Sequence, residues 1–243
     1  MKQAVINNPG SLDYEGNEAL NTACTNISFL GADKKKLVIT SCSMSEGKSF
    51  VAMQILLNLA KRGKRVVLVD TDLRRSFLMN RFDIRTDDQL MGLSNYLAGY
   101  CTSSSIVYET NLYGACFVPI GREVANPMPL LDSQRLPDLL DELAEQFDVV
   151  LIDAPPIGMV VDAASIARYC DGCIFVVEYA KRHKRELVGA VRQMQQSDCP
   201  VLGCILNKVS MKTLSEKKYY SHHYYGHYGH YSQYYSRSKS GEK

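Results

Sequence analysis

The sequence predicts an α/β fold in which helices cover both faces of a doubly wound, mostly parallel β-sheet. Short β-branched apolar runs alternate with segments of helical length, and strand-helix-strand alternation implies parallel pairing. The apolar runs contain few alternating polar residues, as expected of strands buried on both faces. The length of 243 residues is enough for one large α/β domain with a real core.

The strand and helix candidates follow one another in chain order. The expected strands are residues 37–40, 65–70, 115–119, 149–153, 173–177 and 201–206. Helical spacing of apolar residues predicts helices at 17–29, 49–61, 92–97, 132–145, 162–169 and 185–196. Ligands of such sheets bind at the carboxyl ends of the strands, so residues that follow strands are the candidates for a site.

Composition and charge exclude several classes of protein. A net charge of +2 gives no electrostatic argument for nucleic acid, and we expect no nucleic-acid partner. No apolar run approaches the roughly 18 to 20 residues of a membrane span, and no secretory signal is present, so a cytoplasmic chain is expected. The eight cysteines are interpreted as buried free thiols rather than as a metal or redox site.

The two ends of the chain differ from its middle. Residues 1–16 are expected to be a flexible leader, and residues 17–214 to form the domain. Residues 215–243 hold eight of the fifteen tyrosines and almost no aliphatic side chains. Such a segment cannot bury enough surface to offset chain entropy, so we expect a disordered tail. A sticky tyrosine-rich segment and a His-rich metal tract remain alternative interpretations.

Residues 41–50, SCSMSEGKSF, are typical of a phosphate-binding loop. They lie between an expected strand and an expected helix, where backbone N–H groups and the positive helix end face phosphates. Gly47 lets the backbone approach closely. Lys48 would neutralise the β and γ oxygens, and Ser49 would offer a hydroxyl to Mg²⁺. The full pattern has glycine where this chain has Cys42.

Carboxylates follow two other strands. Asp70 ends the run 65–70, Asp72 lies two residues further on, and Asp153 ends the run 149–153. Gathered around a nucleotide, such oxygens suit Mg²⁺, and one could accept a proton from an attacking hydroxyl. An acidic turn paired with Arg74 and Arg75 is the alternative. Together the three segments favour a Mg-nucleotide site.

These segments resemble the Walker A, A′ and B motifs of the bacterial tyrosine kinases. They read SEGKS, VLVDTDLRR and VVLIDAPP, and residues 92–99, 119–133, 162–177 and 201–209 also resemble that family. The resemblance implies a P-loop NTPase fold of the deviant Walker type. The family commonly lacks the first glycine of the loop. It usually has Pro-Gly at Met44-Ser45, so Ser45 is expected to raise backbone strain or shift nucleotide affinity.

The resemblance also implies roles for individual residues. Nucleotide binding is expected from Ser43, Met44, Ser45, Glu46, Gly47, Lys48, Ser49, Phe50 and Asn207. Asn207 would read the adenine, or else is a simple turn residue. The catalytic residues would be Lys48, Asp70 and Asp72, with Asp70 nearest the tyrosine hydroxyl. The metal ligands would be Ser49, Asp70, Asp72 and Asp153.

The implied activity is that of an ATP-dependent protein-tyrosine kinase that uses Mg²⁺ and regulates capsule or exopolysaccharide synthesis or export. It would phosphorylate its own tail at Tyr219, Tyr220, Tyr224, Tyr225, Tyr228, Tyr231, Tyr234 and Tyr235. The implied partners are a membrane-bound activator, whose cytoplasmic segment recruits the chain to the inner face of the membrane, and a cognate tyrosine phosphatase.

A homo-oligomer is also implied, held by an E-x-x-R-x-x-R helix. Glu18 matches the first position of that motif, but Asn21 and Cys24 replace its arginines. Neither residue can supply the bidentate pairing of an arginine with a carboxylate. Assembly through this helix would therefore lack those contacts.

Two other functions stay open. A partitioning or septum-positioning ATPase would carry a second loop lysine at the position of Ser43, which argues against it. A nucleotide-gated scaffold, phosphorylated by another kinase, is the second alternative. The departures at Met44-Ser45, Asn21 and Cys24 are compatible with such a scaffold.

Overall fold

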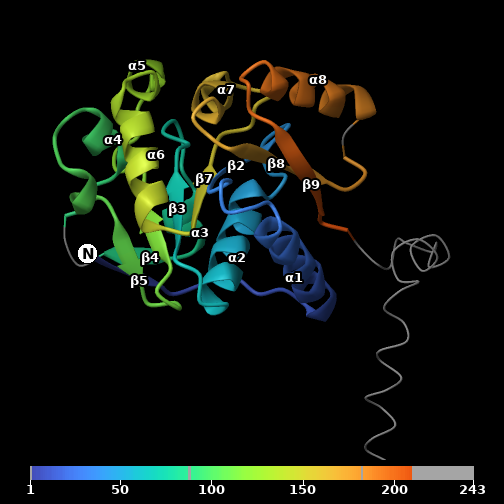
Figure 1. Cartoon of the computed structure of the whole chain (residues 1–243), viewed down its shortest axis with the longest axis horizontal. Coiled ribbons are helices and arrows are strands. Elements are labelled where there is room, and N and C mark those ends of the chain that lie inside the picture. The colour runs from blue at the N-terminus through green and yellow to red at the C-terminus, as the bar shows by residue number, and fades with distance from the viewer. Residues whose placement is uncertain (1, 87–88, 182, 210–243) are drawn as a thin grey trace, which may run out of the picture. The chain divides into compact units, whose positions relative to one another are not determined.

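The computed structural model describes residues 2–86, 89–181 and 183–209, which contain a nine-stranded sheet (Figure 1). The strands are β1 (Lys2–Ile6), β2 (Lys36–Ser41), β3 (Val66–Asp70), β4 (Ile84–Thr86), β5 (Tyr108–Thr110), β6 (Cys116–Val118), β7 (Val149–Asp153), β8 (Gly172–Glu178) and β9 (Val201–Asn207). Their order across the sheet is β4-β1-β5-β6-β3-β7-β2-β8-β9. Strand pairs are parallel except β1 with β4 and β5 with β6. The predicted mostly parallel sheet is confirmed.

Helices connect the strands. They are α1 (Tyr14–Ser28), α2 (Lys48–Lys61), α3 (Leu78–Arg81), α4 (Leu93–Leu97), α5 (Met128–Leu131), α6 (Arg135–Gln146), α7 (Asp162–Ala167) and α8 (Lys184–Gln195), with a 3₁₀ turn, η1, at Ser103–Ser105. The carboxylate of Asp13 accepts a hydrogen bond of 2.7 Å from the Gly16 N–H and caps α1. Every predicted helix is present, with ends shifted by a few residues.

Two hydrophobic clusters lie on opposite faces of the sheet. Along β3, Val67 and Val69 point into one cluster, and Val66 and Leu68 point into the other, because successive side chains of a strand alternate between faces. Helices α1, α2 and α3 cover one face, and α4 to α8 cover the other. In Figure 1, α1 and α2 lie side by side below the sheet. The sheet is therefore doubly wound, as predicted.

The prediction of a flexible leader over residues 1–16 is wrong. Lys2–Ile6 forms β1, which pairs with β4 and β5 inside the sheet. Ala4 and Ile6 are each only 2% exposed, so the segment packs like any other strand. Its two buried positions alternate with polar or exposed ones, a signal too short to stand out in the sequence. Strands β4 and β5, three residues each, were missed for the same reason.

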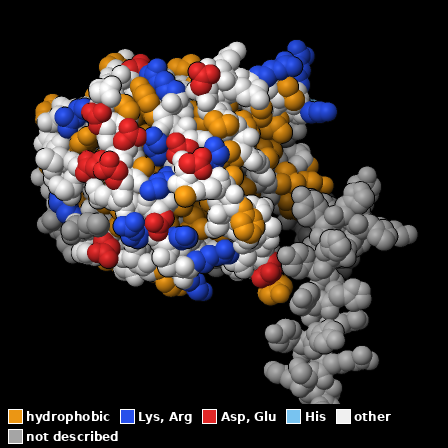
Figure 2. Space-filling view, in the orientation of Figure 1, with side chains coloured by type: hydrophobic (Ala, Val, Ile, Leu, Met, Phe, Trp, Pro, Cys, Tyr) orange, Lys and Arg blue, Asp and Glu red, His pale blue; other side chains and the backbone are white. Residues whose placement is uncertain are grey.

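The surface charges and the state of the cysteines agree with the expectations from the composition. On the face that Figure 2 shows, basic and acidic side chains are interspersed. All eight cysteines are free, and five of them are buried. Cys204, however, is exposed, because β9 is the edge strand of the sheet. Within the described residues no helix has the length and apolar character to cross a membrane. The predicted tail, residues 215–243, lies outside the described part of the chain.

The inclusion of β1 in the folding unit can be tested by Ile6→Ala. Removing a buried isoleucine should lower the free energy of unfolding by about 2–5 kcal/mol, since a cavity is left in the cluster. Val5→Ala is the matched control, because Val5 is 40% exposed on the other face of the same strand, and should change stability by less than about 0.5 kcal/mol. Urea unfolding measures both. Equally small effects would contradict a role of β1 in the core.

Candidate active site

Three strand ends meet at one edge of the sheet. β7 lies between β3 and β2, so Asp70 and Asp153 are direct neighbours in the register of β3 and β7. β2 runs on from Ser41 into the loop that precedes α2. The three predicted segments, separated by up to a hundred residues in the chain, are therefore brought together at the carboxyl edge, where such sheets bind ligands.

The loop between β2 and α2 is held by its own side chains. The Ser41 hydroxyl donates to the Ser43 carbonyl (2.7 Å), and the Cys42 N–H donates to the buried Glu46 carboxylate (3.0 Å). Ser45 has a φ of +63°, a left-handed conformation that costs a residue with a Cβ roughly 1–2 kcal/mol. The predicted backbone strain at Ser45 is therefore confirmed.

Asn207, at the end of β9, braces this loop. Its side-chain amide donates a hydrogen bond of 2.9 Å to the Glu46 carbonyl. Gly47 has a φ of +94°, and a Cβ added there would lie 2.1 Å from the Asn207 amide nitrogen. Only glycine fits both the conformation and the contact. The expected role of Asn207 in reading adenine stays a prediction.

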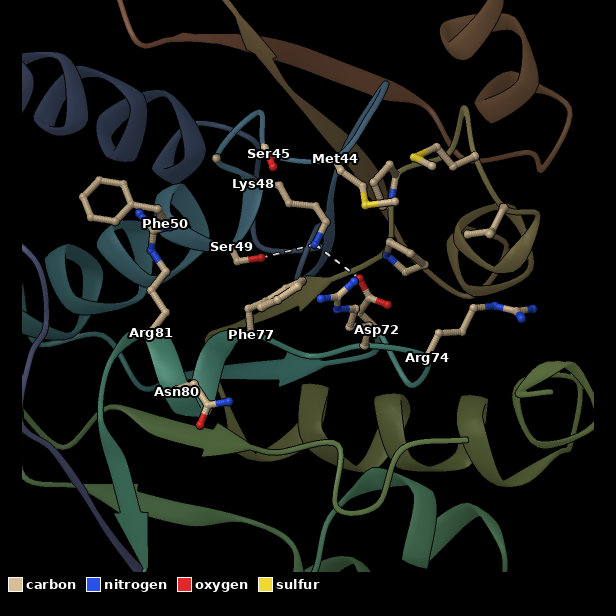
Figure 3. A pocket seen from close by; sticks show the side chains of 16 residues that line it. Met44, Ser45, Lys48, Ser49, Phe50, Asp72, Arg74, Phe77, Asn80 and Arg81 are labelled. Atoms are coloured by element: carbon tan, nitrogen blue, oxygen red, sulfur yellow. Dashed lines mark hydrogen bonds and ion pairs between the residues drawn. The ribbon is translucent and has the colours of Figure 1, made fainter. Parts of the chain in front are cut away.

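Lys48 lies among the carboxylates at the strand ends, and Figure 3 shows its contacts with Ser49 and Asp72. Its ammonium is 3.6 Å from Asp153 Oδ1 and 3.7 Å from Asp72 Oδ2, and it donates a hydrogen bond of 3.2 Å to the Ser49 hydroxyl. Burial alone would lower the pKa of Lys48, but the nearby carboxylates, Asp153 above all, raise it above its ordinary value. The lysine is therefore a fixed positive charge at the start of α2.

Asp70 is fully buried and held in one orientation. It accepts hydrogen bonds from the Ser76 hydroxyl and from the Asp72 N–H (3.2 Å). Burial, and then the neighbouring Asp153, raise the pKa of Asp70 to about 8. Burial also raises the pKa of Asp72, against the opposing effect of Lys48. The site therefore holds more negative charge than one lysine can offset.

The donor set fits a hard divalent cation that brings other ligands with it. Asp153 Oδ1 is buried and has no hydrogen-bond partner. Yet among the described residues no three His, Cys, Asp or Glu side chains are arranged to hold a metal ion by themselves. Mg²⁺ commonly takes only one or two protein carboxylates, with phosphate and water oxygens as its other ligands. The ligand set Ser49, Asp70, Asp72 and Asp153 stays a prediction.

A cavity of about 720 Å³ opens beside these residues. It is lined by Met44, Ser45, Gly47, Lys48, Ser49, Phe50, Asp72, Arg74, Arg75, Phe77, Asn80, Arg81, Pro155, Pro156, Met159 and Val160. The sequence did not predict that residues 74–81 and 155–160 form a wall of the site, and Arg74 and Arg75 were expected there only as partners of an acidic turn. Both segments begin within the second and third motifs and continue beyond them, and this continuity was the signal available for finding them.

Arg74 does not neutralise the acidic turn, contrary to the alternative considered from the sequence. Its guanidinium makes two hydrogen bonds, of 2.7 and 3.1 Å, to the buried carboxylate of Asp162 at the start of α7. A third, of 3.1 Å, reaches the Ala125 carbonyl. Arg74 thus ties the segment after β3 to the opposite wall, and the charges of Asp70 and Asp72 remain available to the site.

The helix expected to carry the oligomer contact is engaged within the chain. Glu18 is exposed on α1 and accepts a hydrogen bond of 3.4 Å from the Asn21 amide. The Asn21 side-chain oxygen accepts from Asn58 (3.0 Å) and Arg62 (3.1 Å) of α2. Cys24 is buried between the two helices. The residues that replace the arginines therefore join α1 to α2.

Comparisons with known proteins agree with this geometry. Residues 37–228 match the CobQ/CobB/MinD/ParA nucleotide-binding domain. The tyrosine-protein kinase CpsD of Streptococcus agalactiae serotype Ia is 39% identical over 193 residues, 79% of this chain and 82% of that protein. The kinase domain of the Escherichia coli tyrosine kinase ETK is 27% identical with a TM-score of 0.74, covering 83% of this chain and 78% of that one. The BceF tyrosine kinase domain is 31% identical with a TM-score of 0.69, covering 78% and 76%.

The close approach of Asn207 to the loop can be tested at Gly47. Gly47→Ala should destabilise the chain more than Gly63→Ala, by about 1–3 kcal/mol of overpacking. Gly63 also has a positive φ, +81°, but nothing lies within 4 Å of its Cβ position. Combining Gly47→Ala with Asn207→Ala should recover part of the difference, because the clash is removed. Urea unfolding of these three variants and of Asn207→Ala alone measures this, and purely additive effects would contradict the contact.

The raised pKa of Asp70 predicts that the stability of the chain depends on pH. Its folded-state pKa, about 8, lies above its ordinary value of 3.8, so the folded chain binds this proton more tightly than the unfolded chain. The stabilising contribution is complete below about pH 4 and is lost as the pH rises through about 8. Asp70→Asn removes this loss, so without divalent cations the variant should gain stability relative to wild type from pH 5 to 8.

Asp148→Asn is the control for this measurement. A hydrogen bond from the Arg65 N–H lowers the pKa of Asp148. The contribution of Asp148 to stability therefore changes only at pH values below the ordinary pKa range of a carboxyl. The difference in unfolding free energy between this variant and wild type should stay constant from pH 5 to 8. A constant difference for Asp70→Asn as well would contradict the raised pKa.

Proposed function

The chain belongs to the bacterial tyrosine kinases of the capsule type, and we propose that it transfers the γ-phosphoryl group of Mg-ATP to tyrosines of its own C-terminal segment. The observation that carries the proposal is the meeting of the phosphate-binding loop with Lys48, Asp70, Asp72 and Asp153 at one sheet edge. Phosphoryl transfer needs positioning and charge neutralisation rather than covalent chemistry from the protein, and this edge supplies both.

In the proposed reaction the phenol oxygen of a tyrosine forms a bond to the γ-phosphorus. The bond from that phosphorus to the oxygen bridging it to the β-phosphorus breaks, and ADP leaves. The phenol proton passes to Asp70, whose buried carboxyl is held in one orientation by the Ser76 hydroxyl and the Asp72 N–H and acts as the general base. Lys48 and the N–H groups at the start of α2 neutralise phosphate charge. The predicted ligands Ser49, Asp70, Asp72 and Asp153 would hold Mg²⁺, which would supply positive charge to the transferring phosphoryl group.

The acceptors in this proposal are the eight tyrosines between Tyr219 and Tyr235. They lie in the part of the chain that the structure does not describe, so the argument rests on the sequence. If residues 210–243 behave as a coil, a segment of about 30 residues has an r.m.s. span near 30 Å. Transfer within one chain and transfer between two copies are then both within reach.

The partners and the location are part of the same proposal. A membrane-bound activator would recruit the chain from the cytoplasm to the inner face of the membrane, and a cognate tyrosine phosphatase would reverse the reaction. A homo-oligomer would use the exposed Glu18, because Asn21 and Cys24 are engaged within the chain. Sedimentation of the purified protein tests assembly, and a monomer at all concentrations would exclude it.

The alternatives are less well supported. At the position where a partitioning ATPase needs a second lysine, Ser43 offers only a hydroxyl, and its carbonyl is bound by Ser41. A scaffold phosphorylated by another kinase would have no need of a buried, oriented carboxylate beside Lys48.

The kinase proposal is tested by incubating the purified chain with Mg-ATP and probing for phosphotyrosine. Lys48→Met should reduce the signal by at least about 100-fold, since a preorganised charge at the phosphates is lost. Lys64→Met is the matched control, because Lys64 is exposed in the turn before β3 and should leave the signal unchanged. Deleting residues 215–243 should abolish it.

Two outcomes would contradict this proposal. Undiminished phosphotyrosine after deletion of residues 215–243 would place the acceptors elsewhere. No phosphotyrosine in the intact chain, even with the cytoplasmic segment of the membrane partner added, would favour the scaffold.

A further inference from the structure

Two arginines in the wall of the cavity have no acidic partner among the residues that the structure describes. Of the charged residues that line it, Lys48 lies between Asp72 and Asp153, and Arg74 binds Asp162. Arg75 and Arg81 take part in no such ion pair within that region. The cavity therefore presents two uncompensated positive charges beside the catalytic carboxylates.

Both guanidinium groups lie over aromatic rings. Arg75 is 4.9 Å from the ring centre of Phe77, and Arg81 is 5.2 Å from that of Phe50. Figure 3 shows Arg81 reaching toward Phe50, with Phe77 below Lys48 and Ser49. Stacking of this kind holds the cation in place while leaving its N–H donors free to bind. Phe77 is also 53% exposed, so one ring face can take a ligand.

The combination of two guanidinium groups with an exposed ring suits a phosphate monoester carried on an aromatic ring. A guanidinium pairs with phosphate through two parallel hydrogen bonds, and a ligand ring can stack against Phe77. Phosphotyrosine carries both groups on one side chain and is the product of the proposed reaction.

Resting on the proposed function, we propose that Arg75 and Arg81 form a phosphotyrosine-binding subsite that holds one modified residue of the C-terminal segment while the next tyrosine reaches Asp70. Residues 217–241 contain no Asp or Glu. The unmodified segment therefore offers these arginines no anion, and charge complementarity arises only after the first phosphorylation, which adds about −1.5 to −2.

The spacing of the tyrosines sets how far the modified residue lies from the next acceptor. Tyr225, Tyr228, Tyr231 and Tyr234 recur every three residues, and an extended chain rises about 3.3 Å per residue. Each modified tyrosine thus lies about 10 Å from the next acceptor in an extended segment. A phosphotyrosine held at the subsite keeps the segment bound. The first phosphorylation of a segment is then slow, and later phosphorylations of the same segment are faster.

Binding is tested with two fluorescent peptides of residues 224–235, one phosphorylated at Tyr228 and one unmodified, added to the dephosphorylated full chain without ATP. Fluorescence anisotropy should give at least tenfold tighter binding of the phosphopeptide. The double variant Arg75→Ala and Arg81→Ala should lose this preference, and replacement of both by lysine should restore only part of it, because the bidentate geometry is missing. Arg85→Ala is the matched control. Arg85 is exposed on β4, where it pairs with Asp83 outside the cavity, and this variant should keep the preference.

Equal affinity of the wild-type chain for both peptides would overturn the proposal. A loss of affinity for a non-hydrolysable ATP analogue in the double alanine variant, parallel to the loss for the phosphopeptide, would also overturn it, because the arginines would then bind the nucleotide. Peptide binding requires no phosphoryl transfer. A chain that discriminates the peptides but forms no phosphotyrosine would therefore refute the proposed function alone.

Intact-mass spectrometry during autophosphorylation gives a second measurement. The wild-type chain should pass quickly from unmodified to multiply phosphorylated forms, whereas the double alanine variant should accumulate singly phosphorylated chains. The same distribution of forms in both proteins would contradict retention of the product at this subsite.

Discussion

The structure depends on the placement of one lysine among three carboxylates that the sheet brings to the same edge. Lys48 lies within 4 Å of Asp72 and Asp153, and Asp70 is buried beside them. Buried carboxylates without enough countercharge are costly, and they respond by holding protons or by attracting cations. Burial and the neighbouring Asp153 raise the pKa of Asp70, and Asp153 Oδ1 accepts no hydrogen bond although Lys48 lies 3.6 Å away, as expected where positive charge is short. The same shortage makes the edge suitable for a metal-bound nucleotide.

The surrounding elements hold these side chains in place without supplying further positive charge to the carboxylates. Asn207 holds the loop from the edge strand β9, and Ser45 accepts a strained conformation within that loop. Arg74 could have neutralised the acidic turn, but it is bound to Asp162 on the far wall. The carboxylates therefore remain available to a metal-bound nucleotide, and Arg75 and Arg81 remain available to an anionic ligand. In this proposal the negative and the positive side chains of the cavity bind different ligands.

Much of the fold could be read from particular residues. The Val, Ile and Leu runs of β2, β3, β7 and β8 are nearly continuous and buried on both faces, and this pattern is hard to mistake. Strands β1, β4 and β5 escaped because they lack such a run and mix polar with apolar residues over three to five positions. The wall of residues 74–81 was missed because arginine and phenylalanine are ordinary on any surface. The contact of Arg81 with Phe50 appears only once α3 is packed beside α2.

The sequence by itself determined the alternation of strands and helices, the phosphate-binding loop and the carboxylates at the strand ends, because these depend on local spacing and residue type. The tertiary structure alone decided which charges remain uncompensated. Whether Arg74 neutralises Asp72 or binds Asp162 depends on how α7 packs, 88 residues further along the chain. Electrostatic interactions act through space, and local spacing does not determine the distances between residues so far apart in the chain.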